Sequence, residues 1–298
     1  MARIPLTIDV ALAPALLRRD PARQRRTVSI VVDVIRATTT LCVLFERGCR
    51  RVEVASDIQH ARAAAAPRRA ALAARQLPPL LAGEVGGLAP AGFDCGNSPA
   101  EFAPLDLSDR EVIFATTNGT RALHACAGDA ATLVGAFRNA AAVARVAVSA
   151  ASCLGEVAAP ADEPDATLEQ AMAPDDEDAP HGPSIVVVCA GRDQYPAFDD
   201  TVCAGYLAES VRREAIAAGH ATSLGNGAQI AIAASQSAVH DGLRATLGAS
   251  GAGRAIESVG LASDLDLCAE IDACPHVPTT APLLSTSDLL VLQLWTQD

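Results

Sequence analysis

The chain has 298 residues, half of them hydrophobic, and carries a net charge of −12 at pH 7. This length suffices for one large α/β domain or two modest ones with a sizeable core. No basic stripe for a nucleic acid is present, and because the chain contains no lysine, a Schiff-base lysine and a P-loop lysine are excluded.

Strand and helix patterns alternate along the chain. This alternation predicts an α/β protein with a mostly parallel sheet covered by helices on both faces. Strands are predicted at 28–34, 51–55, 79–82, 111–116, 131–135, 184–190 and 289–295. Helices are predicted at 38–48, 57–66, 98–103, 119–127, 138–152, 199–217, 236–247, 251–258 and 264–271.

An acidic, proline-rich segment at 155–183 interrupts this alternation. Eight acidic residues lie between 157 and 182 and the segment has no arginine, so it can bury little apolar surface and is predicted to be a linker or surface insertion. A metal-binding acidic loop is the alternative, although the segment lacks glycine-punctuated ligand spacing. The segment separates an N-terminal half, 1–154, from a C-terminal half, 184–298, which we expect to complete the same compact unit.

The first polar loop follows the strand 28–34 and leads directly into a helix. It places Asp33 and Arg36 at the strand end, ahead of three consecutive threonines. A carboxylate there can hold a cation, and an arginine beside a helix N-terminus can hold an oxyanion. Asp33 could instead be a helix cap. A haloacid-dehalogenase nucleophile is excluded, because Ile35 stands where that motif needs a second aspartate.

Three further loops carry polar residues at similar places. In the loop 92–101, Ser98 and Glu101 fit a capping box, which leaves Asp94 and Asn97 as ligand candidates. The loop 116–121 leads into a helix through hydroxyls, an amide and a glycine, a pattern that suits an anion.

The last of these loops follows the strand 184–190. It contains Gly191 and Arg192, and then paired acids at Asp199 and Asp200. Such a pair can simply complement a helix dipole or can bind a hard cation. No nucleophilic triad and no cysteine-phosphatase loop is present, and no Cys-x-x-Cys pair suggests a zinc ribbon.

Taken together and in this order, the loops resemble the 2-phosphosulfolactate phosphatase family. The resemblance covers about residues 28 to 280. After Gly83-Glu84 the family usually has an arginine, and this chain has Val85. The segments that carry the resemblance are 32–40, 83–84, 92–99, 116–120, 188–191, 199–205, Gly260, 264–268 and 277–278.

The resemblance implies a three-layer αβα fold with a mostly parallel or mixed sheet. It also implies a Mg²⁺-dependent phosphoric monoester hydrolase that converts (2R)-2-phospho-3-sulfolactate into sulfolactate and phosphate, a step toward coenzyme M. That substrate carries a phosphate, a sulfonate and a carboxylate. A site rich in arginine, hydroxyls and backbone amides suits such a small anion.

On this hypothesis Asp33 and one of Asp199 or Asp200 hold Mg²⁺. Arg36 stabilises charge on the phosphoryl group, and Glu84 or Asp94 acts as a base or second metal ligand. An aspartyl-phosphate intermediate on Asp33 stays open. The residues predicted to bind phosphate or substrate are Thr38, Thr39, Asn97, Thr117, Asn118, Gly119, Thr120 and Gly191.

Two alternatives remain: a phosphatase of the same fold that acts on another small phosphorylated carboxylic acid, and a non-catalytic binder of an anionic metabolite. The expected partner is a small phosphorylated anion, with no nucleic acid and no membrane. A homodimer is left open. No signal-like or spanning apolar run is seen, so we expect a cytoplasmic protein with reduced thiols.

Overall fold

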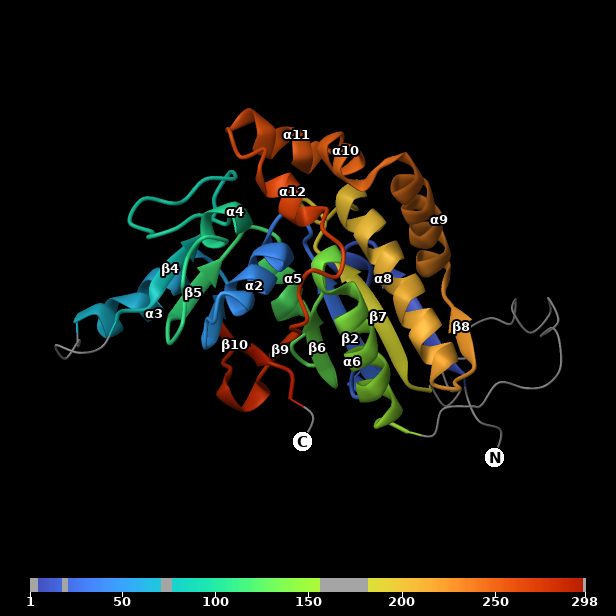
Figure 1. Cartoon of the computed structure of the whole chain (residues 1–298). Coiled ribbons are helices and arrows are strands. Elements are labelled where there is room, and N and C mark those ends of the chain that lie inside the picture. The colour runs from blue at the N-terminus through green and yellow to red at the C-terminus, as the bar shows by residue number, and fades with distance from the viewer. Residues whose placement is uncertain (1–4, 18–20, 71–76, 156–181, 297–298) are drawn as a thin grey trace.

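The computed structural model describes residues 5–17, 21–70, 77–155 and 182–296 (Figure 1). Within them ten strands form one mixed sheet with helices on both sides, in the order β4-β5-β3-β10-β9-β6-β2-β7-β1-β8. The strands are β1 (Leu6–Ala11), β2 (Thr27–Val32), β3 (Arg51–Ala55), β4 (Leu80–Gly83), β5 (Glu111–Ala115), β6 (Ala131–Val134), β7 (Ser184–Cys189), β8 (Thr222–Leu224), β9 (Pro278–Thr280) and β10 (Leu289–Leu294).

The helices alternate with the strands over most of the chain, and four follow one another after β8. The α-helices are α1 (Pro21–Gln24), α2 (Ala37–Glu46), α3 (Ile58–Ala70), α4 (Pro99–Phe102), α5 (Gly119–Ala125), α6 (Ala140–Ser152), α8 (Phe198–Ala217), α9 (Asn226–Asp241), α10 (Leu243–Gly248), α11 (Gly251–Ser258) and α12 (Asp264–Cys268). Short 3₁₀ turns cover Pro14–Leu16, Phe137–Asn139 and Pro282–Leu284.

The sheet consists of two parallel blocks that run in opposite directions. One block is β6, β2, β7, β1 and β8, and the other is β3, β5 and β4. Strands β9 and β10 join the blocks through three successive antiparallel pairings. Sheet twist of about 20–25° per pair accumulates to roughly 100–125° between β5 and β2. This rotation allows the carboxyl ends of both blocks to face one another.

The largest core lies between the larger block and the helices α6, α8 and α9. On β2, Val28, Ile30 and Val32 point into this core, while Val31 belongs to the core on the other side. Strands buried on both faces read as nearly continuous apolar runs, which is why β2 and β7 were recognisable from the sequence.

A second and a third core cover the two faces of the smaller block. Val112 and Phe114 of β5 pack in the second core, which includes residues of α2 and α5. Ile113 packs in the third core with Ala61 and Ala65 of α3. Because adjacent residues of β5 point to opposite sides, this block is also covered by helices on both faces.

The structure confirms all seven predicted strands to within two residues at each end. Strands β1, β8 and β9 were missed, the last two because three residues show no periodicity. The helix predicted at 236–247 is wrong: the chain forms two helices that meet at Gly242, whose φ is +97°. A positive φ is costly for other residues and ends the first helix there.

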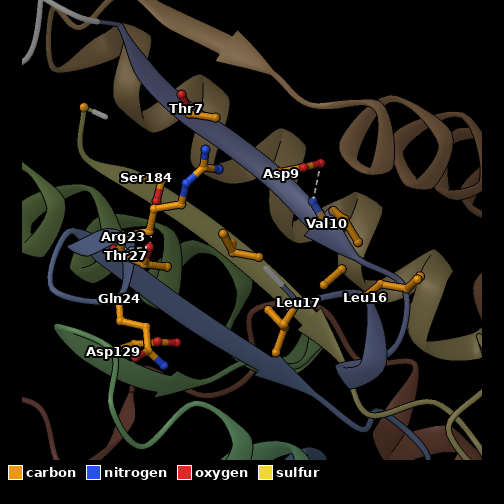
Figure 2. Close-up of a pocket in the computed structure, with 13 residues that line it drawn as sticks. Thr7, Asp9, Val10, Leu16, Leu17, Arg23, Gln24, Thr27, Asp129 and Ser184 are labelled. Carbon is orange, nitrogen blue, oxygen red and sulfur yellow. Dashed lines mark hydrogen bonds between the residues drawn. The ribbon is translucent and has the colours of Figure 1, made fainter. Parts of the chain in front are cut away.

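On the face of β1, β7 and β2 that is turned away from the largest core, helix cover is incomplete: α5 packs against β2, and Arg23 and Gln24 of α1 lie beside the start of β2. A hollow of about 230 Å³ lies there, and Figure 2 shows Thr7, Asp9, Thr27 and Ser184 along it. The hydroxyls of Thr27 and Ser184 hydrogen-bond to each other at 2.9 Å. A polar sheet face of this kind can stay in contact with water. None of the candidate site residues lines this hollow.

Residues 156–181 of the predicted acidic segment lie outside the described residues. Strand β7, which follows them, pairs with β1 and β2 from the first half of the chain. No helix among the described residues is long and apolar enough to cross a membrane.

Helices α8 and α9 approach closely at Gly205, and this contact gives a stability prediction. A Cβ at Gly205 would lie 1.9 Å from the carbonyl oxygen of Ala231. We expect Gly205→Ala to lower the free energy of unfolding by about 3 kcal/mol, because backbone must move to admit it. Gly128→Ala is the control, since a Cβ there would meet only ordinary contacts. Equal urea midpoints for the two variants would contradict this packing.

Candidate active site

A cavity of about 510 Å³ opens where the loops after β2, β4, β5 and β7 meet the first turns of α8 and α11. Figure 1 shows α11 and α12 at the top of the molecule, above the ends of these strands. Nine residues that the sequence singled out line the cavity: Asp33, Arg36, Glu84, Asn97, Thr117, Asn118, Gly191, Asp199 and Asp200.

Asp33 lies at the carboxyl end of β2, between the first turns of two helices. Its carboxylate accepts hydrogen bonds from the backbone amides of Ala37, in α2, and Gly119, in α5. A Cβ at Gly119 would lie 2.7 Å from Asp33 Oδ2, so only glycine permits this approach. The amides and the dipoles of α2 and α5 favour the charged form of Asp33.

Two more carboxylates connect neighbouring loops in the same way. Asp200 accepts the amide of Val34 on Oδ1 and that of Gly191 on Oδ2, both at 2.9 Å, and so joins the loops after β2 and β7. Glu84 accepts the amide of Thr117 at 2.8 Å and that of Gly87 at 2.9 Å. Glu84 therefore fixes its own loop against the one that follows β5.

The crowding of acids changes their proton affinities. Burial raises the pKa of Asp33 from 3.8 to about 7, and the charges of Asp199 and Glu84 add to the rise. Burial, followed by the charges of Asp199 and Asp33, raises the pKa of Asp200 well above its ordinary value. Burial also raises the pKa of Asp199. Raised carboxylate pKa values of this kind are typical of functional sites, where a bound cation or substrate supplies the opposite charge.

Arg36 lines the cavity but is already bound to other groups of the protein. Its Nη1 lies 2.7 Å from Asp264 Oδ2, and its Nη2 donates to the carbonyl of Gly87 at 2.6 Å. The other oxygen of Asp264 accepts from the Ser98 hydroxyl at 2.6 Å and from the amide of Ala100 at 3.1 Å. This buried pair thus joins α12, α4 and the two loops beside the cavity.

The donor set of the cavity fits a magnesium ion. Asn97 is 4% exposed and lines the cavity, and its Oδ1 has no hydrogen-bond partner in the described structure. Together with the carboxylates it makes a site of oxygen donors, which Mg²⁺ prefers. No three His, Cys, Asp or Glu side chains among the described residues could hold a metal together. Mg²⁺ needs only one or two carboxylates, because waters and substrate phosphates complete its shell.

Three of the predicted phosphate-binding hydroxyls do not line the cavity. Thr38 accepts the amide of Asp33, and Thr39 donates to the carbonyl of Val34. Thr120 donates to the carbonyl of Thr116. All three therefore support the loops that carry the site. Gly119 likewise acts through its close contact with Asp33.

Asp94 lies away from the cavity. Its Oδ2 accepts the amide of Leu81 at 2.7 Å and pairs with Arg69. The structure therefore separates Asp94 from the other acids and gives it a local role beside β4. Ser98 caps α4 as predicted, because its side chain accepts the amide of Glu101.

Three residues beside the cavity were given no individual role from the sequence, although Arg192 was noted on its loop. Asp264 is fully buried and holds Arg36, and Ser250 hydrogen-bonds to Asp199. Arg192 lines the cavity on the loop after β7. The Asp264 segment stood out only as part of the resemblance. A partner more than two hundred residues from Arg36 leaves no local signal.

Comparisons with known proteins agree on one family. The family described as 2-phosphosulpholactate phosphatase matches residues 13–160 and 170–282. A "Probable 2-phosphosulfolactate phosphatase" of Deinococcus radiodurans is 35% identical over 86% of this chain and 88% of its own length. Proteins of the same name from Thermus thermophilus and Thermosynechococcus vestitus are 32% and 31% identical, over 84% and 87% of this chain and 86% and 91% of their own lengths.

The raised pKa of Asp33 predicts how stability depends on pH. The folded state binds this proton more tightly than the unfolded chain, so the free energy of unfolding falls between about pH 4 and 7. Asp33→Asn removes this titration. In EDTA, the variant should gain stability relative to the parent from pH 4 to 8, by at most about 4 kcal/mol. The measurement is urea unfolding of both proteins across this pH range. A difference in their unfolding free energies that does not change with pH would contradict the raised pKa of Asp33.

The Arg36–Asp264 pair predicts two very different results for two aspartates of α12. Asp264→Ala leaves a guanidinium that is 3% exposed without its counter-ion, and should cost about 3–5 kcal/mol of unfolding free energy. Asp266→Ala removes a surface partner of Arg244, and should cost less than about 1 kcal/mol. The measurement is the thermal unfolding midpoint of each variant. Equal midpoints would contradict the stabilising role of the buried Arg36–Asp264 pair.

Proposed function

The chain belongs to the 2-phosphosulfolactate phosphatase family, and from this premise we propose that it hydrolyses 2-phosphosulfolactate with the help of Mg²⁺. Water adds across the ester P–O bond, which yields inorganic phosphate and the free hydroxyl of sulfolactate. The observation that carries the proposal is the group of buried carboxylates around one cavity, set against the first turns of helices. The names of the relatives supply the substrate.

Asp33 and Asp199 would hold Mg²⁺, with the unpartnered Asn97 Oδ1 as a further oxygen near them. Both carboxylates have a raised pKa that an added cation would relieve. Asp200 is the least exposed of the three aspartates, at 2%, and joins the loops after β2 and β7, so we assign it to holding these loops together. The metal would supply positive charge to the phosphoryl oxygens and orientation to the attacking water.

The protein's own groups would then bind the phosphoryl group. Thr117 and Asn118 line the cavity at the start of α5. The amides of Thr117 and Gly119 already donate to Glu84 and Asp33, so the Thr117 hydroxyl, Asn118 and the helix dipole are left to favour an anion. Arg36 adds positive charge from a fixed position, since Asp264 and the Gly87 carbonyl hold it. Groups fixed before the reaction stabilise the charge of the transition state without reorganisation.

Glu84 is the carboxylate that we assign to proton transfer. It lines the cavity and is half-buried, while Asp94 lies elsewhere. Glu84 would take the proton of the attacking water as the P–O bond breaks. The amides of Thr117 and Gly87 keep its oxygens in place during that step.

Asp33→Asn should reduce Mg²⁺-dependent phosphate release at least about 100-fold while the protein stays folded. The side chain stays nearly isosteric, but the charge that a hard cation needs is lost. Asp57→Asn is the matched control, because Asp57 is exposed and caps α3 by accepting the amides of Gln59 and His60. Asparagine caps almost as well, so that variant should keep full activity.

The measurement is phosphate release from 2-phosphosulfolactate across a magnesium titration for the parent and both variants. The same rate and magnesium midpoint in all three proteins would refute the role of Asp33. Absence of release by the parent, together with tight binding of the ester, would favour a non-catalytic binder instead.

A further inference from the structure

The cavity holds several acids, and among the described residues that line it only Arg36 and Arg192 are cationic. The two arginines differ in what they already contact. Arg36 is 3% exposed and is bound by Asp264 and by the carbonyl of Gly87. Its charge is therefore largely compensated within the protein.

Arg192 has no such partner. Its guanidinium makes no hydrogen bond or ion pair with the part of the chain that the structure describes, although it lines the cavity. Burial raises the pKa of Asp199 and the charge of Arg192 opposes part of that rise, so the guanidinium lies close to the acids. A Cβ built on Gly251 would lie 4.0 Å from Arg192 Nη1, which places the guanidinium beside the first turn of α11. A guanidinium without a hydrogen bond or ion pair to the described residues is available at this point to a ligand.

The backbone that carries Arg192 is a tight turn. The amide of Arg192 donates to the carbonyl of Tyr195 and the amide of Tyr195 to the carbonyl of Arg192, both at 2.9 Å. The two residues between them, Asp193 and Gln194, have φ values of +51° and +71°. Two consecutive central residues with positive φ define a type I′ turn. Left-handed non-glycine residues cost free energy and concentrate at functional sites.

Gly191 fixes the position of this turn against the cavity. Its φ is +66°, and a Cβ there would lie 2.3 Å from the carbonyl oxygen of Tyr195. Its amide donates to Asp200, which also holds the loop after β2. Arg192 therefore stands on a backbone that is tied on both sides, so binding an anion has to order only its side chain.

We propose that Arg192 binds an acid group on the carbon skeleton of the substrate, a carboxylate or a sulfonate, and so selects phosphate esters that carry such a group over neutral ones. The inference rests on the proposed function, because it names the substrate class of that same site. Arginine suits this task, since its planar fork binds both oxygens of an acid group. The phosphoryl group is left to Arg36, to Thr117 and Asn118 at the start of α5, and to the metal.

Three esters of the same 2-phosphorylated skeleton separate acid recognition from phosphoryl recognition. Glycerol 2-phosphate carries no acid group, 2-phosphoglycerate carries a carboxylate, and 2-phosphosulfolactate carries a carboxylate and a sulfonate. Arg192→Gln should lower kcat/KM for the two acids about 10- to 100-fold, mainly through KM. It should change kcat/KM for glycerol 2-phosphate less than about threefold. Arg192→Lys should recover part of the loss.

Arg213→Gln is the control, because Arg213 is exposed in the second half of α8 and does not line the cavity. An equal fall of kcat/KM for all three esters in Arg192→Gln would overturn the inference and assign Arg192 to the phosphoryl group. No fall for any ester would also overturn it.

Binding of sulfolactate, measured by calorimetry, separates this inference from the proposed function. Sulfolactate has both acid groups and no phosphoryl group, so the measurement does not depend on turnover. Arg192→Gln should weaken its binding about 10- to 100-fold relative to the parent and to Arg213→Gln. Equal affinities would overturn the role of Arg192 even in an active phosphatase. Weaker binding in an inactive protein would support Arg192 and refute the phosphatase.

Discussion

The site depends on the burial of acids that would repel one another if nothing held them. Asp33, Glu84 and Asp200 each accept two backbone amides, and in each case the two amides belong to different segments of the chain. The acids therefore carry the negative charge of the site and also hold its loops together. Because hydrogen bonds offset only part of the cost of burial, the pKa values of Asp33 and Asp200 stay raised. The cavity is left with a deficit of positive charge that a cation or a cationic group can meet.

The sheet topology explains how loops from distant strands reach one cavity. The block of β3, β5 and β4 runs opposite to the block that contains β2 and β7, and the short strands β9 and β10 lie between them. Twist turns the carboxyl ends of both blocks toward each other. Helix α12 then contributes Asp264, which ties Arg36 and the start of α4 to the same place. A substrate would thus meet groups from nearly the whole length of the chain.

Local patterns predicted the parts of the site that local forces determine. Asp33 was recognisable because a buried strand ends there and a helix begins at once, and the loop after β5 stood out for the same reason. The partnership of Arg36 with Asp264 depends on packing between distant elements, which leaves no mark near either residue. Asp94 had the right chemistry but faces Arg69 and the edge of β4. Strand β1 was missed although its buried residues Leu6, Ile8 and Val10 alternate with less buried ones. Its partner β7 lies far away in the sequence.

We propose that these acids form a cation site on which the phosphate ester is hydrolysed. Crystals soaked with Mn²⁺ in place of Mg²⁺ test it most directly, because anomalous scattering locates the ion. We expect one peak in the cavity, within coordination distance of an oxygen of Asp33, and its loss in Asp33→Asn. A cavity without a peak at saturating Mn²⁺, or a peak that persists unchanged in Asp33→Asn, would contradict it.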